Sequence, residues 1–113
     1  MATLTLASFP NSRIKPRPAT SSRDTSIFEV PLNTVSLVAA ENLNRTDLLI
    51  KNLDSSLSLW YGYDASINDN IGGDGAVRLE AGESVSIDVG GDIYVFNPDG
   101  ANSVNVSIDE GQG

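Results

Sequence analysis

The sequence predicts an all-β fold: an antiparallel β-sandwich of jelly-roll type that follows an extended N-terminal arm. Three observations predict it. Short runs that alternate apolar and polar residues recur from Ser26 onward, turn-forming residues separate them, and no window shows a convincing helical repeat. Short strands with regular breaks are typical of a sandwich rather than of a βαβ fold. The 113 residues leave room for one domain, so we expect an arm over 1–25 and a sandwich over 26–113.

The predicted arm differs from the rest of the chain in charge and in proline content. Residues 1–23 hold four cations and no acid, net +4, whereas residues 24–113 hold three cations and all 15 acids, net −12. Pro10, Pro16 and Pro18 disfavour helix and predict an extended segment. An unfolded tail and a transit peptide also fit this composition. We interpret the segment as an arm that binds another subunit or a partner. The predicted contact residues of the arm are Leu4, Leu6, Phe9, Arg13, Ile14, Lys15 and Arg17.

The body of the chain divides into eight predicted strands. The clearest alternation places Val104, Val106 and Ile108 on one face of a strand and polar residues on the other. Asp, Asn, Ser, Gly and Pro, which suit tight turns, fill the breaks at 54–56, 68–75, 81–82, 90–91 and 97–100. The predicted strands are Ser26 to Val30, Thr34 to Ala39, Arg45 to Asn52, Leu57 to Tyr63, Ala76 to Glu80, Ser84 to Asp88, Asp92 to Phe96 and Ser103 to Ile108.

Three aromatic residues gather on the fourth of these strands. Alternation places Trp60 on one face and Tyr61 and Tyr63 on the other. We expect Trp60 in the core, and Tyr61 and Tyr63 as contacts on the outer face. Aromatic side chains there stack on sugars or pack against a protein neighbour.

Composition removes most enzyme classes. The chain has no His and no Cys, which excludes an imidazole base, a thiol nucleophile, and zinc sites made from these ligands. Glu80 and Glu83 flank the predicted turn at Ala81 and Gly82, where a solvated hairpin tip offers no pocket to raise a carboxyl pKa. We therefore predict a protein that is not an enzyme and has no cofactor.

The segment from Asn68 to Gly75 is the richest in oxygen ligands. Asp69, Asn70 and Asp74 are of the type that calcium prefers. However, Ile71 stands where an EF-hand needs an oxygen ligand and no Glu closes the loop, so a long surface turn is the simpler interpretation.

Nucleic acid and membranes are not expected partners. An acidic body repels nucleic acid and anionic lipid surfaces. The longest apolar run, Val35 to Ala40 with Ser36 inside it, is far shorter than the ~20 residues that a membrane-spanning helix needs.

The stretch from Arg45 to Ser84 carries a family resemblance. Its motifs are Arg45-Thr-Asp-Leu-Leu-Ile-Lys-Asn52, Leu59-Trp-Tyr-Gly62 and Gly75-Ala-Val-Arg-Leu-Glu-Ala-Gly-Glu-Ser84. This pattern resembles small β-sandwich virion proteins of tailed bacteriophages, namely head decoration (cement) proteins and related head or tail attachment modules. Physically, Asn52 can close a turn through its side chain, Gly62 permits a bend, and Gly82 suits a positive φ.

The resemblance implies a structural protein on the exterior of a virion. Its partner would be the major capsid protein of the assembled head, which it would stabilise because it binds only the assembled lattice. We expect a homotrimer first and a dimer second. The alternative is a carbohydrate-binding or host-attachment module of a tail or head fibre that uses Trp60, Tyr61 or Tyr63.

Overall fold

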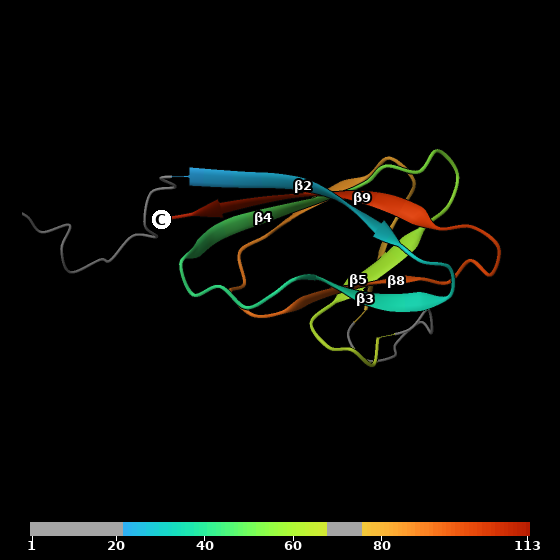
Figure 1. The fold of residues 1–113 in the computed structure, drawn as a ribbon, viewed down its shortest axis with the longest axis horizontal. Helices are drawn as coiled ribbons and strands as arrows, with labels where there is room; N and C mark the ends of the chain where they lie inside the picture. The colour runs from blue at the N-terminus through green and yellow to red at the C-terminus, as the bar shows by residue number, and fades with distance from the viewer. Residues whose placement is uncertain (1–21, 68–75) are drawn as a thin grey trace, which may run out of the picture.

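The computed structural model describes residues 22–67 and 76–113, and these form a two-layer β-sandwich (Figure 1). The first sheet has the strand order β2-β9-β4-β7 and the second has the order β3-β8-β5-β6; every paired neighbour is antiparallel. This order, in which most successive strands cross between the sheets, is that of a jelly roll. The predicted fold class is therefore confirmed. The strands are β2 (Ser22–Val30), β3 (Thr34–Ala39), β4 (Arg45–Asn52), β5 (Leu59–Gly62), β6 (Val77–Leu79), β7 (Ser84–Ile87), β8 (Ile93–Asn97) and β9 (Val104–Gln112).

The core lies between the sheets and consists of the inward-facing residues of each strand. Alternation gives β8 and β9 their buried residues: Ile93 and Val95 on β8, and Val104, Val106 and Ile108 on β9. β4 adds Leu48 and Ile50, and β5 adds Leu59 and Tyr61. Burial of these apolar side chains stabilises the sandwich.

β2 begins earlier than the sequence predicted. It pairs with β9 from Ser22, opposite Gln112, through to Val30, opposite Val104. Residues 22–25, which we assigned to the arm, are therefore part of the first sheet. β9 likewise continues four residues beyond the predicted end at Ile108, because it pairs with β2 on one side and with β4 on the other.

Arg45 joins the loops at the end of the sandwich where β2 begins. Its side chain is fully buried, and Nε donates to Glu110 Oε2 at 2.7 Å. Its other nitrogens donate to the carbonyl oxygens of Ala40, Val89 and Gly91 at 2.7–2.8 Å. A buried guanidinium is stable only when paired and hydrogen-bonded in this way. The β4–β5 and β8–β9 loops lie at the opposite end (Figure 1).

Candidate functional site

The outer faces of the two sheets differ in chemistry. On the second sheet, the register places Trp60 opposite both Phe96 and Arg78. It also places Phe96 opposite Val35, and Tyr94 opposite Leu37. Residues that lie opposite one another, or two apart on one strand, point to the same side, so all six side chains share one face. Five of these six are apolar or aromatic. We call Val35, Leu37, Tyr94, Phe96 and Trp60 the aromatic face.

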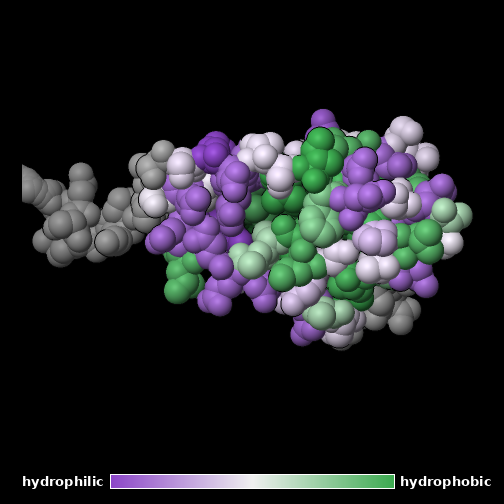
Figure 2. All heavy atoms as spheres, in the orientation of Figure 1, coloured by the Kyte–Doolittle hydropathy of each residue, from purple (hydrophilic) through white to green (hydrophobic). Residues whose placement is uncertain are grey.

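The outer face of the first sheet is mostly polar, although the same face also carries two exposed apolar residues, Ile27 on β2 and Leu49 on β4. Arg23 on β2 donates to both carboxylate oxygens of Asp47 on β4 at 3.0–3.1 Å, and to Asp109 on β9 at 3.1 Å. Asp109 also accepts from the Thr25 hydroxyl. Gly111 lies beneath this network, and a Cβ there would collide with Asp47 and Arg23. Figure 2 shows hydrophilic residues around the end where β2 begins, and hydrophobic residues gathered between the edges of β2 and β3.

The prediction for the faces of β5 was wrong. Tyr61 is 8% exposed and belongs to the core, whereas Trp60 points outward and is half-buried. Tyr63, which follows the strand, is 51% exposed, in agreement with its predicted outer position. The reason is that Leu59 and Tyr61 lie on the same face of the strand, and this face turns toward the core. Trp60 lies on the opposite face, together with Ser58 and Gly62.

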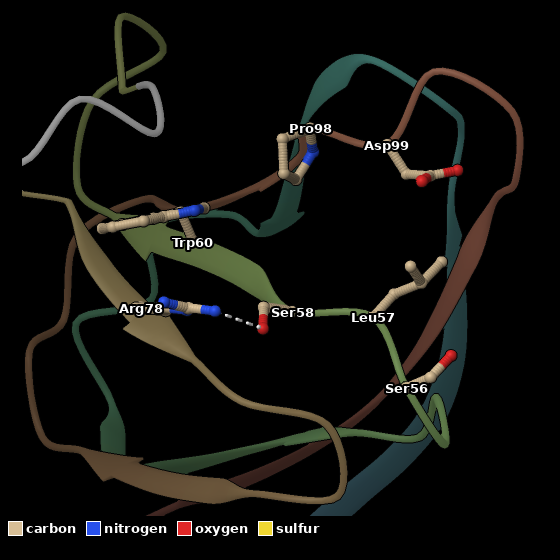
Figure 3. A pocket seen from close by; sticks show the side chains of 7 residues that line it. All are labelled: Ser56, Leu57, Ser58, Trp60, Arg78, Pro98 and Asp99. Carbon is tan, nitrogen blue, oxygen red and sulfur yellow. Dashed lines mark hydrogen bonds between the residues drawn. The ribbon is translucent and has the colours of Figure 1, made fainter.

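A groove of about 530 Å³ lies on the outer side of the second sheet, at the end with the β4–β5 and β8–β9 loops. Trp60 and Arg78 come from neighbouring strands, and Pro98 and Asp99 come from the β8–β9 loop (Figure 3). Arg78 is held in place because it pairs with Glu80 at 3.1 Å and donates to the Ser58 hydroxyl at 3.3 Å. The lining residues are Ser56, Leu57, Ser58, Trp60, Arg78, Pro98 and Asp99.

Asn52 fixes the first of the two loops that border this groove. It is fully buried, and its Nδ2 donates to the carbonyl oxygens of Leu57 at 2.8 Å and Leu79 at 3.2 Å. Its Oδ1 accepts from the backbone N–H of Asp54, whose carboxylate in turn accepts from the N–H groups of Ser56 and Leu57. Asn52 thus closes its own turn and links β4 of the first sheet to β6 of the second.

Asn97 repeats this arrangement in the second loop. Its Nδ2 donates to the carbonyl oxygens of Asn102 at 2.9 Å and Val30 at 3.2 Å, and its Oδ1 accepts from the N–H of Asp99. The Asp99 carboxylate accepts from the N–H groups of Ala101 and Asn102. The two loops share the pattern Asn-x-Asp-x-x-x-Ser, at 52–58 and at 97–103. Sequence reasoning missed this internal repeat, which was visible as two matching segments 45 residues apart.

The turns that accompany these loops also correspond. Gly82 follows β6 with φ +76°, and Asn33 follows β2 with φ +48°. Gly82 lies three residues after Leu79, whose carbonyl oxygen accepts from Asn52. Asn33 lies three residues after Val30, whose carbonyl oxygen accepts from Asn97. Gly and Asn are the residues that most readily adopt a positive φ. β5 ends at Gly62 and the chain bends directly after it; in addition, a Cβ at Gly62 would lie 2.6 Å from Ile67 Cγ2, so the close packing of Ile67 also requires glycine there.

The carboxylates of the two loops are stabilised in their ionised form. Backbone N–H donors, those of Ser56 and Ala101 foremost, lower the pKa of Asp54 and of Asp99. Arg78 and Asp99 are the charged residues of the lining, and because Arg78 is paired with Glu80, the Asp99 carboxylate is the charge that the groove offers a ligand.

Several predicted residues lie outside the described part of the chain. This applies to the metal candidates Asp69, Asn70 and Asp74, and to every predicted contact of the arm: Leu4, Leu6, Phe9, Arg13, Ile14, Lys15 and Arg17. Within residues 22–67 and 76–113, no group of three or more acidic residues could hold a metal ion. No helix in these same ranges is long and apolar enough to cross a membrane.

Comparison with known proteins agrees with the fold. No family model matches the chain, and no curated protein matches it significantly. A cupin-2 domain containing protein from Shewanella frigidimarina NCIMB 400 superposes with a TM-score of 0.53 at 14% identity, over 84% of this chain and 76% of that one. The stem and receptor binding domain of the bacteriophage PM2 spike protein gives 0.46 at 27% identity, over 74% and 32%. A chain of the Bacillus endospore appendages, which are disulfide-linked pili, gives 0.45 at 12% identity, over 96% and 100%.

Proposed function

We propose that this protein is a non-enzymatic structural module of a bacteriophage virion, a decoration (cement) protein that binds the exterior of the assembled head. The single observation that carries the proposal is the contrast between the two outer faces. Exposure of a largely apolar sheet face to water is unfavourable, whereas burial of that face against a partner is favourable. Such a face is therefore typical of a protein that docks on one side. The sequence motifs from Arg45 to Ser84 support the choice of partner by their resemblance to such proteins.

The mode of binding follows from this contrast. The aromatic face, in which Leu37 is 44% exposed, lies against the major capsid protein, and the polar face of the first sheet stays in water. The arm adds apolar contacts through Leu4, Leu6 and Phe9, while its cations steer the approach. Because only the assembled lattice offers this site, binding shifts the equilibrium toward the intact shell.

Cosedimentation with undecorated heads of the phage that encodes the chain tests the proposal. The protein should pellet with assembled heads and stay in solution with unassembled capsid protein. Mass spectrometry of purified virions should find hundreds of copies per particle. Failure to pellet with assembled heads would overturn the proposal.

A carbohydrate-binding attachment module is the second candidate, because Trp60 lies outward beside Ser58 and Arg78 in the groove. An aromatic ring flanked by polar side chains is a surface on which a sugar can stack. Binding to a glycan array, together with only a few copies per virion, would favour this candidate.

A further inference from the structure

The groove beside Trp60 combines features that suit a particular kind of peptide. Its walls present a tryptophan ring, Pro98 and the side chain of Leu57. The lining also holds the Asp99 carboxylate, while the charge of Arg78 is paired with Glu80. Aromatic-lined grooves bind proline-rich segments in polyproline conformation, which lose little conformational entropy on binding. Negative charge at such a groove selects cations, and an indole ring also attracts a guanidinium or an ammonium group.

The chain itself contains a segment of this chemistry. Residues 15–18 read Lys-Pro-Arg-Pro, with Arg13 two positions earlier and no acid anywhere in residues 1–23. In polyproline conformation four residues extend about 12 Å. A groove of about 530 Å³ falls within the size range of ligand sites in proteins.

Distance rules out the groove of the same copy for most of this segment. β2 starts at Ser22 beside Gln112, at the far end of β9 from Val104, so the sandwich is about 27 Å long between these ends. The groove lies at the Val104 end and on the other sheet, about 10 Å further across. A fully extended chain carries Arg17 about 18 Å from Ser22 and Lys15 about 25 Å. The backbone of neither residue reaches the groove of its own copy, so Pro16 and Pro18 cannot dock there.

We propose that residues Lys15–Pro18 of one copy dock in the Trp60 groove of a second copy. The arm leaves the body at one end and the groove lies at the other, so the contact is head-to-tail and closes most simply as a ring. A ring of three copies agrees with the expected homotrimer. This inference does not rest on the head as partner. It assigns Trp60 to the arm of the second copy, and it leaves the rest of the aromatic face, together with Leu4, Leu6 and Phe9, for contact with the head.

Two classes of variant separate the arm from the groove. Pro16→Ser with Pro18→Ser changes the ligand segment, and Trp60→Ala changes the groove. The matched controls are Pro10→Ser, a proline of the arm outside residues 15–18, and Tyr63→Ala, an exposed aromatic residue outside the groove. Sedimentation velocity measures self-association of each full-length protein. We expect the first two variants to weaken self-association at least tenfold and the controls to leave it unchanged. Circular dichroism checks that each variant is folded.

Mixing the two defective variants gives the sharpest test. The arm variant keeps an intact groove, and the Trp60→Ala variant keeps an intact arm, so together they should form a mixed complex that neither forms alone. Because Trp60 is the only tryptophan, its fluorescence in the mixture reports on the groove of the arm variant directly. Its emission should move to shorter wavelength when the Trp60→Ala partner is added.

Three results would overturn the proposal. One is a wild-type protein that stays monomeric at millimolar concentration. Another is self-association that survives both Trp60→Ala and the double proline substitution, or that fails to return in the mixture. The third is a neutral oligosaccharide that shifts Trp60 emission without displacing any self-association, because the groove would then be a sugar site. Loss of binding to phage heads alone would bear on the proposed function and not on this contact.

Discussion

The two sheets of the sandwich have the same number of strands but differ in the chemistry of their outer faces. On the first sheet, Arg23, Asp47 and Asp109 form ion pairs across three strands. On the second, Phe96 stands between Val35 and Trp60 with no charged residue among them. The inner faces are alike, since both supply apolar residues to one core. Folding therefore explains the inner faces of both sheets and the polar outer face of one. The aromatic face requires a separate explanation, and we assign it to binding.

Substitutions of Tyr61 and Trp60 compare the inner and the outer face of one strand, β5. Among the substitutions proposed for this protein, the loss of Tyr61 should lower stability most. Tyr61→Ala empties a core position and should cost about 3–5 kcal/mol of unfolding free energy. Trp60→Ala, on the outer face, should cost about 1 kcal/mol. Urea unfolding measures both. Equal losses would mean that the two faces of β5 are not distinct.

The two Asn-x-Asp loops should respond alike even though the faces differ. Asn52→Ala and Asn97→Ala each leave two carbonyl oxygens and one backbone N–H without their side-chain partner. Each variant should lose about 3 kcal/mol, because a buried polar group left unpaired is costly. Thermal unfolding compares them. A large loss for one and none for the other would show that the repeat is not equivalent in energy.

Acid should act through the same two loops. The pKa values of Asp54 and Asp99 are lowered in the folded state, so the unfolded state takes up protons first as pH falls below about 4. The stability from these carboxylates is complete above that pH and is lost as pH falls through the folded-state pKa values. The Asp54→Asn and Asp99→Asn double variant should therefore show a smaller drop in melting temperature between pH 5 and pH 2. An unchanged drop would assign the acid sensitivity to other groups.

The polar face should contribute least. Arg23→Gln removes the contacts to Asp47 and Asp109, but Arg23 is exposed and water screens its charge. We expect a small decrease in melting temperature at low salt that vanishes at high salt. A decrease of the same size at every salt concentration would mean that Arg23 stabilises β2 by packing rather than by charge. Deletion of residues 1–21, which retains Arg23, should leave a folded sandwich.

The sequence was sufficient to predict the strands but not the surfaces. β3 and β4 have the predicted bounds, because alternation and turn residues define both ends. β2 and β9 extend further than predicted, since their polar ends, from Ser22 to Thr25 and from Asp109 to Gln112, are ordered by pairing with each other and carry no alternation. Such long-range pairing leaves no local signal.

The groove shows the same limit for the candidate site. Alternation along a strand places Trp60 and Tyr61 on opposite faces but does not say which of them faces the core. That is decided by Leu59, which shares a face with Tyr61. Arg78 and Pro98 meet Trp60 through the topology of the second sheet, which no short-range pattern encodes. The repeated Asn-x-Asp motif was readable in the sequence, and a search for internal repeats would have found it.

Binding of two matched variants to undecorated heads tests the central claim, that one outer face docks and the other does not. Leu37 on β3 and Ile27 on β2 are exposed apolar residues on edge strands of opposite sheets. Quantitative cosedimentation should find that Leu37→Asp weakens binding to heads at least tenfold, whereas Ile27→Asp binds as the wild type does. Equal binding by both variants, or a loss confined to Ile27→Asp, would contradict the assignment of the aromatic face as the docking surface.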